Sequence, residues 1–538
     1  MSQTDPIGND GPPRQLAAPP LITVRKLSLA IHGAPILNEI DLAIQPGAVT
    51  ALVGESGSGK SMTALALMGL LPGGSTTTGQ ALFDGSDLLT LSERAWLGLR
   101  GDDIAMIFQE PMTALNPVHT IGAQVAEPLR LCGIRRAEAA RIARDRLDRV
   151  GLSHVPLDRY PHELSGGQRQ RVCIAMAIAR RPRLLIADEP TTALDVTTQA
   201  EILSLLRSLV DDEGMALLLI THDLGVVAGM ADHVAVMERG CIVESDRTEA
   251  LFRGHRHPYT AALLAASRPP PHTPRPPDGT AILEARDLRR TYGAVTAVDG
   301  VSFTLHRGES LGLVGESGCG KSTLTRALLG LEPLQGGSVT FDGTPGGQSM
   351  TRRQRARISV VFQDPYGSFN PRWTVRRIVQ EPFHLTGKPR DADAQAARAL
   401  TEVGLTTADL EKYPHEFSGG QRQRIAIARA LITKPQVLVL DEAVSALDVR
   451  VRAQVLALLS ELQDRLGLSY LFISHDLTVV RAICDRVLVM QGGRIVEQGA
   501  IDKVFEAPAA AYTRRLIDAA PRIPAEWLAA RNTPAATG

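Results

Sequence analysis

One eight-residue pattern occurs twice in this chain, and it limits the folds that the chain can adopt. The first copy is Gly54-Glu55-Ser56-Gly57-Ser58-Gly59-Lys60-Ser61, and the second is Gly315-Glu316-Ser317-Gly318-Cys319-Gly320-Lys321-Ser322. Each copy follows a short apolar run that favours a strand and precedes a run of helix formers. This order predicts a phosphate-binding loop, in which backbone N–H groups and the positive end of a helix face one anion. A plain glycine-rich turn is disfavoured by the Lys-Ser pair that closes both copies.

Later landmarks of the chain repeat as well. Ser165-Gly166-Gly167-Gln168 returns as Ser418-Gly419-Gly420-Gln421, Asp188-Glu189 returns as Asp441-Glu442, and His222 returns as His475, all at one constant separation. A constant separation across several motifs indicates duplicated domains, and this period is far too long for a solenoid repeat. A chain of 538 residues also exceeds what one hydrophobic core usually holds.

Composition marks the boundaries between these domains. Prolines crowd residues 269–277, which predicts a semi-extended linker; residues 1–20 are polar and contain several prolines, and the C-terminal end contains Pro508, Pro521, Pro524 and Pro534. We expect a disordered leader (1–20), a first domain (21–266), a linker (267–280), a second domain (281–515) and a C-terminal tail (516–538).

The pattern within each domain predicts an α/β fold. Leu184–Asp188 and Leu217–His222 are apolar runs with a polar residue at the end, as is typical of strands buried on both faces of a parallel sheet. Alternating runs at 22–27 and 40–44 predict antiparallel strands, and residues 120–163 predict inserted helices. Ligands bind at the carboxyl ends of strands in open α/β sheets, so the lysine, the acids and the histidine are expected to converge there.

Charge and cysteine content exclude several classes of protein. Basic and acidic residues both number 58, and this balance argues against a nucleic-acid-binding protein. The five cysteines are scattered without a C-x-x-C pair, which fits a reducing compartment and no structural metal. No apolar run approaches the roughly 18–20 residues that cross a bilayer, and the first 20 residues lack the apolar core of a signal peptide. We therefore expect any work at a membrane to require partner subunits.

Two smaller features invite a functional interpretation that we do not favour. His255, His257 and His272 could suggest a metal site, but without supporting acids or cysteines we expect a solvated tail. Cys319 could be a reactive thiol near a helix N-terminus, but a small residue tolerated in the place of Ser58 is the simpler interpretation.

The order of the motifs supports a family assignment. Phosphate-binding loop, glutamine, Ser-Gly-Gly-Gln, apolar strand ending in Asp-Glu, Ala-Leu-Asp and histidine resemble the nucleotide-binding domains of ABC ATPases. The resemblance covers nearly all of residues 21–265 and 281–515. It implies an α/β protein of two tandem P-loop NTPase domains, each with a mostly parallel core sheet, an antiparallel β subdomain and an inserted helical subdomain.

The resemblance also assigns roles in ATP hydrolysis with Mg²⁺. Lys60 and Lys321 would hold phosphates, with the rest of both glycine-rich loops around them. The implied metal-site residues are Ser61, Gln109 and Asp188 in the first half and Ser322, Gln363 and Asp441 in the second. The implied catalytic residues are the general bases Glu189 and Glu442, the γ-phosphate contacts His222 and His475, and the sensors Gln109 and Gln363.

In this family each Ser-Gly-Gly-Gln motif faces the nucleotide of the opposite half. The resemblance thus implies two ATP molecules sandwiched head to tail, one between Lys60 and Ser418 and the other between Lys321 and Ser165. Both sites have every catalytic residue, so we expect both to hydrolyse ATP. Tyr292 fits the aromatic residue that stacks on adenine in the second half, whereas the first half offers His32, which stacks more weakly.

Two stretches narrow the class further. Phe108-Gln109-Glu110-Pro111 and Phe362-Gln363-Asp364-Pro365 look like the peptide/nickel importer ATPases, and the joined halves resemble the fused pair of the glutathione and microcin/peptide importers. This implies uptake of peptides or related small solutes with two permease subunits and a periplasmic solute-binding protein. It also implies no nucleic acid, contact with the membrane only through the permeases, and a peripheral position on the cytoplasmic face of the inner membrane.

The competing class comprises soluble ABC proteins that act on ribosomes or DNA. The translation factors join their halves by a long charged helical linker and the repair ATPases have zinc-binding cysteine pairs, and this sequence has neither. Co-purification with ribosomes would favour that class. The sequence leaves the transported solute open.

Overall fold

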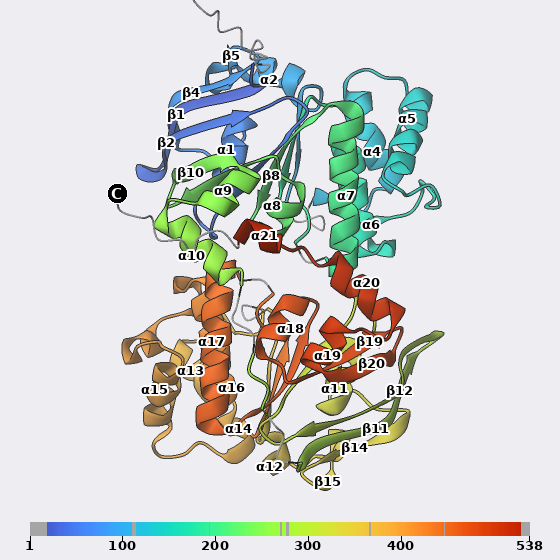
Figure 1. The fold of residues 1–538 in the computed structure, drawn as a ribbon, viewed down its shortest axis with the longest axis vertical. Coiled ribbons are helices and arrows are strands. Elements are labelled where there is room, and N and C mark those ends of the chain that lie inside the picture. Colours follow the sequence, from blue (N-terminus) through green and yellow to red (C-terminus); the bar gives the residue numbers. More distant parts are fainter. Residues whose placement is uncertain are drawn as a thin grey trace, which may run out of the picture.

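The computed structural model describes residues 19–109, 114–192, 194–268, 272–275, 279–364, 367–445 and 447–528. Nearly all of the expected leader lies outside them. Each half contains a four-stranded antiparallel sheet, a six-stranded mostly parallel sheet and a group of helices (Figure 1). The predicted α/β class is therefore confirmed. Among the described residues, no helix has both the length and the apolar character that a bilayer-spanning segment requires.

The strands of the two halves correspond one to one. The first half has β1 (Ile22–Ile31), β2 (Ala34–Ile44), β3 (Val49–Val53), β4 (Ser75–Phe83), β5 (Ser86–Asp87), β6 (Ile104–Ile107), β7 (Leu184–Asp188), β8 (Ala216–Thr221), β9 (His233–Glu238) and β10 (Cys241–Arg247). The second half has β11 (Ala281–Tyr292), β12 (Val295–His306), β13 (Ser310–Val314), β14 (Gly336–Phe341), β15 (Thr344–Pro345), β16 (Ile358–Val361), β17 (Val437–Asp441), β18 (Ser469–Ser474), β19 (Arg486–Gln491) and β20 (Arg494–Ala500).

The strand orders match between the halves. They are β2-β1-β4-β5 and β10-β9-β3-β8-β7-β6 in the first half, and β12-β11-β14-β15 and β16-β17-β18-β13-β19-β20 in the second. The strands β3, β6, β7, β8 and β9 pair in parallel, and β10 alone runs antiparallel to its neighbour β9. All residues of β3 and β7 are buried, as expected for strands covered on both faces.

The helices cover these sheets and form the inserted subdomains. The first half has α1 (Lys60–Leu67), α2 (Glu93–Leu99), α4 (Ile121–Leu131), α5 (Arg136–Arg149), α6 (Gly166–Ala177), α7 (Val196–Glu213), α8 (Leu224–Met230), α9 (Thr248–Gly254) and α10 (Pro258–Ala266). The second half has α11 (Lys321–Leu328), α12 (Arg352–Arg355), α13 (Val375–Gln380), α14 (Phe383–Thr386), α15 (Ala392–Glu402), α16 (Gly419–Leu431), α17 (Val449–Leu466), α18 (Leu477–Ile483), α19 (Ile501–Glu506), α20 (Ala511–Ala519) and α21 (Ala525–Leu528).

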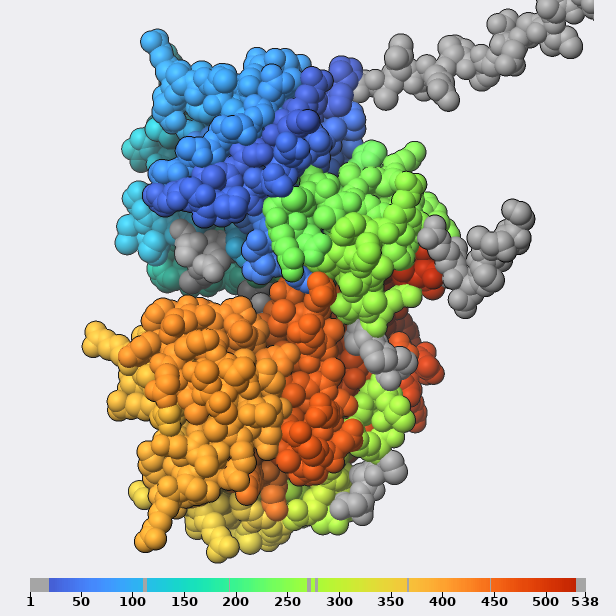
Figure 2. Space-filling view, turned by 90° about the vertical axis from the view of Figure 1, so that its left-hand side faces the viewer, coloured from blue at the N-terminus to red at the C-terminus, as the bar shows by residue number. Residues whose placement is uncertain are grey.

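The halves are stacked as two lobes and exchange helix contacts (Figure 2). Helix α10 of the first half packs on α17 of the second, and α20 of the second half packs on α7 of the first. Helix α20 also runs through residues 515 and 516, where we expected the second domain to give way to a tail.

Two segments that follow these helices cross to the opposite half. In the linker, His272 Nε2 lies 2.8 Å from Asp485 Oδ1, and the two side chains are only 5% and 4% exposed. Near the C-terminus, the Trp527 ring meets Phe252 edge-on at 5.8 Å between centroids. The expectation that His272 belongs to a solvated tail is therefore wrong, because a buried carboxylate of the second half holds it in place.

Candidate functional site

The first phosphate-binding loop joins β3 to α1. Gly59 takes the left-handed conformation at the start of the helix, with φ of 104°, and a Cβ on Gly54 would lie 2.2 Å from the Met237 carbonyl oxygen. Only glycine fits these two positions without strain. Lys60 Nζ donates hydrogen bonds of 2.8 Å to the carbonyl oxygens of Gly54 and Glu55, so its ammonium lies over the loop.

The second loop, between β13 and α11, has the same geometry. Gly320 has φ of 110°, and Lys321 Nζ donates to the carbonyl oxygens of Gly315 and Glu316 at 2.8 Å each. Burial raises the pKa of Cys319 despite the nearby Lys321 ammonium. The thiol therefore stays protonated, in line with the interpretation of Cys319 as a small loop residue rather than a reactive one.

Carboxylates occupy the carboxyl end of β7. Asp188 is the last residue of the strand, and Glu189 follows it with φ of 46°. A non-glycine residue in the left-handed region costs about 1–3 kcal/mol, and such strain concentrates at functional sites. Glu189 Oε2 accepts hydrogen bonds from Gln109 Nε2 at 3.0 Å and Thr192 Oγ1 at 2.9 Å, and His222 Nδ1 lies 3.3 Å from Oε1. The predicted glutamine, glutamate and histidine are thus brought together.

The second half repeats this cluster at the end of β17. Glu442 has φ of 49°, its Oε2 accepts a hydrogen bond of 2.8 Å from Gln363 Nε2, and His475 Nδ1 lies 3.4 Å away. Asp441 precedes it at the tip of the strand.

The electrostatics of the cluster separate the two acids. Burial works to raise the pKa of Glu189, but hydrogen bonding and charge from His222, with Thr192 and Lys60, lower it to about 2. Burial raises the pKa of Asp188, and a hydrogen bond from Ser61 opposes that shift. Glu189 is therefore ionised at neutral pH and can orient or activate a water molecule.

The surroundings of Asp188 show whether this site suits a metal ion. Its Oδ1 is buried and has no hydrogen-bond partner among the described residues, and the Ser61 hydroxyl contacts the same carboxylate. A buried carboxylate oxygen and a hydroxyl beside a phosphate-binding loop are the ligands that Mg²⁺ prefers. The residues present fit this ion.

Each Ser-Gly-Gly-Gln motif starts a helix of the inserted subdomain. Ser165 Oγ accepts a hydrogen bond from Gln168 N at 3.2 Å and Ser418 Oγ accepts one from Gln421 N at 3.4 Å, so both serines cap their helices. A Cβ on Gly167 would lie 2.3 Å from Thr198 Cγ2, which explains glycine there, and Gly420 meets Val451 in the same way. Gly166 and Gly419 open these helices.

The pattern-based reasoning did not single out residues that reach across the interface. Leu194 and Asp195 of the first half line a cavity of about 360 Å³ with Lys321 of the second. Burial lowers the pKa of Lys60, and Asp448 of the second half is among the acids that oppose the shift. Arg450 Nη1 lies 2.9 Å from Glu55 Oε1 of the first loop. Asp195 and Asp448 are the acids of the repeated Ala-Leu-Asp motif, which the sequence analysis noted without assigning it a role.

Two tyrosines were likewise missed as parts of the loops. The Tyr259 hydroxyl accepts a hydrogen bond from Glu55 N at 3.1 Å, and the Tyr512 hydroxyl accepts one from Glu316 N at 3.0 Å. Tyr259 belongs to α10 and Tyr512 to α20. The Tyr-Thr pair that occurs in both helices was the available signal in the sequence.

The expected adenine contacts differ in environment. Tyr292 is 42% exposed, with the Arg290 guanidinium 4.5 Å from its ring centroid. The His32 ring instead packs over Gly74, where a Cβ would lie 2.4 Å from the ring.

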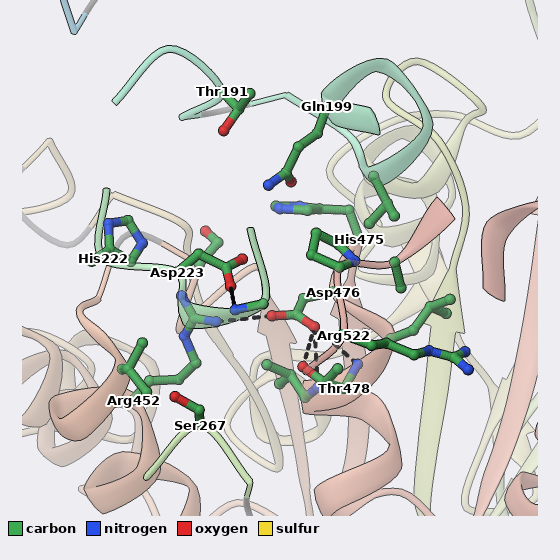
Figure 3. A pocket seen from close by; sticks show the side chains of 18 of the residues that line it. Thr191, Gln199, His222, Asp223, Ser267, Arg452, His475, Asp476, Thr478 and Arg522 are labelled. Carbon is green, nitrogen blue, oxygen red and sulfur yellow. Dashed lines mark hydrogen bonds and ion pairs between the residues drawn. The ribbon is translucent and has the colours of Figure 1, made fainter. Parts of the chain in front are cut away.

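A cavity of about 480 Å³ lies between the clusters around Glu189 and Glu442 at the ends of β7 and β17, the two strand-tip clusters (Figure 3). It is lined from both halves, by His222 and Asp223 of the first and His475 and Asp476 of the second. Residues of both clusters therefore line one space between the halves.

Comparisons with known proteins agree with this arrangement. Residues 37–192 and 298–445 match the family model described as ABC transporter, and residues 243–288 and 496–537 match the model for the C-terminal region of oligopeptide/dipeptide transporters. The "Peptidoglycan transport ATP-binding protein YejF" of Agrobacterium fabrum is 50% identical over 527 residues, covering 93% of this chain and 96% of that protein. The "Uncharacterized ABC transporter ATP-binding protein YejF" of Escherichia coli is 48% identical, covering 90% of this chain and 95% of its own length. The "Glutathione import ATP-binding protein GsiA" of Shigella dysenteriae is 46% identical, covering 94% and 90%. This chain therefore belongs to the ABC transporter family, as an ATP-binding and ATP-hydrolysing importer subunit with both nucleotide-binding domains in one polypeptide.

Proposed function

We propose that the chain clamps two ATP molecules between its halves and thereby drives uptake of a peptide or peptide-like solute through partner permeases. The observation that supports this proposal is the reach of each half into the other's loop. Asp448 lies close enough to Lys60 to act on its charge, and Leu194 and Asp195 share a cavity with Lys321. The two domains would be residues 21–266 and 281–515.

The residues of each strand-tip cluster would divide the work of hydrolysis. Lys60 would hold the β- and γ-phosphates, where its ammonium gains counter-charges that offset its burial. Glu189 would orient and activate the attacking water, and His222 and Gln109 would contact the γ-phosphate from either side of that carboxylate. The second half would use Lys321, Glu442, His475 and Gln363 in the same roles. Tyr292, and more weakly His32, would meet adenine.

Mg²⁺ would be held by Ser61 and Asp188 in the first half, with Gln109 beside them, and by Ser322, Asp441 and Gln363 in the second. The ion would neutralise phosphate charge when bound. Burial raises the pKa of Asp188 because it disfavours the ionised carboxylate. A bound cation would favour that ionised form.

The Ser-Gly-Gly-Gln helices would complete the clamp. Gly420 packs on Val451 in the first turn of α17, and Arg450 in that same turn reaches Glu55. These contacts support a position of Ser418 on the side of the second half that faces the first loop. A small closing motion would bring the N-terminus of α16, a favourable anion site, to the phosphates beside Lys60, and α6 would serve Lys321.

The partners follow from the subunit's class. We propose two permease subunits as the route across the membrane, an extracytoplasmic solute-binding protein that supplies the solute, and a peripheral position on the cytoplasmic face of the inner membrane. One relative is named for glutathione import and another for peptidoglycan transport, so a solute with peptide bonds is the best candidate.

The test measures ATP turnover in single-site variants of the purified chain. Glu189→Gln and Glu442→Gln should each cut ATPase activity severely, and the double variant should abolish it, since glutamine keeps the shape but cannot act as a base. Glu461→Gln, on the exposed face of α17, is the matched control and should retain full activity. A fully active Glu189→Gln or Glu442→Gln variant would refute two working sites. Uptake of a labelled peptide by vesicles that contain the complete transporter tests the solute class.

A further inference from the structure

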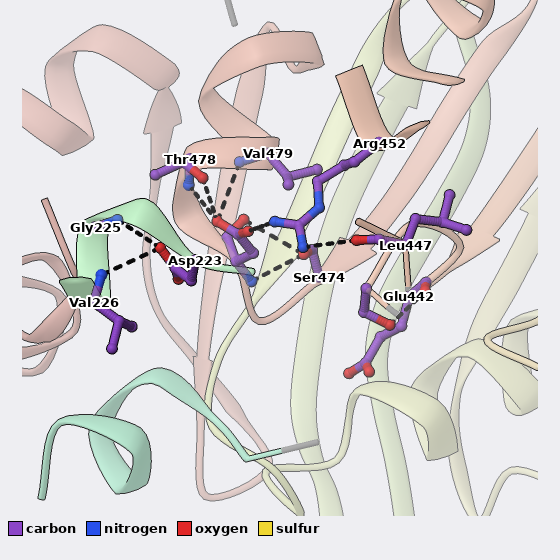
Figure 4. Close-up of polar contacts among 11 residues, drawn as sticks. Asp223, Gly225, Val226, Glu442, Leu447, Arg452, Ser474, Thr478 and Val479 are labelled. Atoms are coloured by element: carbon purple, nitrogen blue, oxygen red, sulfur yellow. Dashed lines mark hydrogen bonds and ion pairs between the residues drawn. The ribbon is translucent and has the colours of Figure 1, made fainter. Parts of the chain in front are cut away.

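Arg452 joins two loops of the second half that serve different ATP sites. It lies in the first turns of α17, and its side chain is only 19% exposed. Its Nη1 donates to Asp476 Oδ2 at 2.9 Å and its Nη2 donates to the Leu447 carbonyl oxygen at 3.1 Å (Figure 4). The planar guanidinium fork can hold both acceptors at once, which an ammonium cannot do in the same geometry.

The first acceptor belongs to the loop around the second ATP site. Asp476 follows His475 directly, and its Oδ1 accepts hydrogen bonds from Thr478 N at 2.9 Å and Val479 N at 3.3 Å, which start α18. His475 in turn lies 3.4 Å from Glu442. Arg452 therefore holds the residue that directly follows His475.

The second acceptor belongs to the loop that faces the first ATP site. Leu447 precedes Asp448, the acid near Lys60, and Arg450 follows with its ion pair to Glu55 at 2.9 Å. One side chain thus links the histidine loop beside Lys321 to the loop that approaches Lys60.

Among the described residues, the first half lacks this link. The position of Arg452 is taken there by Gln199, which lines the same central cavity and forms no side-chain hydrogen bond with any described residue. Asp223, the counterpart of Asp476, accepts hydrogen bonds from Gly225 N at 2.8 Å and Val226 N at 3.3 Å, and the arginine whose charge acts on it is Arg452 of the second half. The two halves are therefore built differently at this position.

We propose that Arg452 is a positioning residue that couples the Lys321 site to the Lys60 site, and that no side chain among the described residues of the first half provides an equivalent link. This inference depends on the proposed function, because it assumes two hydrolytic sites. Its physical basis is the pair of charge-assisted hydrogen bonds that make the two loops move as one body.

The experiment compares ATP turnover in the two single-site backgrounds. Residual activity of Glu442→Gln reports the Lys60 site, and residual activity of Glu189→Gln reports the Lys321 site. We expect Arg452→Gln, which copies the first half, to lower kcat at the Lys60 site about tenfold, the size of effect that loss of one charge-assisted hydrogen bond produces. KM for ATP should stay unchanged there, and the loss at the Lys321 site should be smaller. Gln199→Ala, the matched control, should change neither site more than about twofold.

A general destabilisation of the second half would give the opposite order, because Arg452 belongs to the same half as Lys321. An equal loss at both sites, or a larger loss at the Lys321 site, would overturn the inference. Arg452→Lys keeps a charge beside Asp476 but cannot hold both acceptors, so it should restore the Lys321 site and not the Lys60 site. If Arg452→Gln unfolds because Asp476 loses its partner, the double variant with Asp476→Asn removes that charge and should show the same loss at the Lys60 site. Failure of both single-site backgrounds to lower activity would instead refute the proposed function.

Discussion

The buried contact between linker and second half allows a quantitative prediction. Asp485 Oδ1 accepts hydrogen bonds from His272 Nε2 at 2.8 Å and Arg275 N at 2.7 Å, and Oδ2 accepts one from Ser310 N at 2.8 Å. His272→Ala removes one of three donors from a carboxylate that is only 4% exposed. A hydrogen bond to a charged group contributes about 1.5–3 kcal/mol, and little water can replace it here, so we expect the second half to lose about 2–3 kcal/mol of unfolding free energy.

Calorimetry and hydrogen exchange measure this loss. For domains of this size, 2–3 kcal/mol lowers Tm by roughly 4–12 °C, and the shift should fall on the transition of the second half. Exchange of the Ser310 amide, which donates to the same carboxylate, should accelerate. His154→Ala replaces an exposed histidine and serves as the control. The reasoning fails if His272→Ala costs as much in an Asp485→Asn background as in the native chain, because the pair would then contribute nothing jointly.

Three further predictions concern the loop, the tail and pH. Gly54→Ala places a Cβ 2.2 Å from a backbone oxygen, so nucleotide binding measured by calorimetry should be lost, whereas Gly229→Ala, with open space around it, should bind normally. Trp527→Ala removes the ring packed on Phe252, so hydrogen exchange in α9 should rise; unchanged exchange would mean that the tail does not cover this helix. The pKa of Glu189 is lowered to about 2, so this acid is ionised above that pH. The residual ATPase activity of Glu442→Gln should therefore show no inflection from this carboxylate between about pH 6 and pH 4, and a decline centred near its ordinary pKa of about 4.5 would contradict the assignment.

Local patterns in the sequence were sufficient for the elements that bear the site. The apolar run Leu184–Asp188 is β7 with the same bounds, and the helix that the sequence predicts over 169–180 is α6, which begins and ends three residues earlier. These elements are predictable because a continuous apolar run and a capping serine act through neighbouring residues. The convergence of Glu189 and His222 followed from the rule that ligand sites lie at the carboxyl ends of parallel strands, whereas Gln109 was assigned to the site only by the resemblance to ABC ATPases.

Contacts between the halves could not be predicted in this way. Arg450 and His272 each look like ordinary solvated polar residues within their own segments, and only the packing of the halves gives them their partners Glu55 and Asp485. Side-chain periodicity describes how one element meets its own core and contains no information on a second domain. The strain at Glu189 is equally invisible in the sequence, because a positive φ at a glutamate is imposed by the surrounding strands.

The crossed segments have a consequence for how far the molecule can open. The linker is fixed on the second half and the C-terminal residues are fixed on the first. The halves can therefore separate by rotating about the edge where these two segments cross, and the two segments keep that edge together. Reclosure is then a reaction within one molecule, at an effective concentration of the order of millimolar. Its rate should not depend on how many copies of the protein a cell contains, which is an advantage that a pair of separate chains would lack.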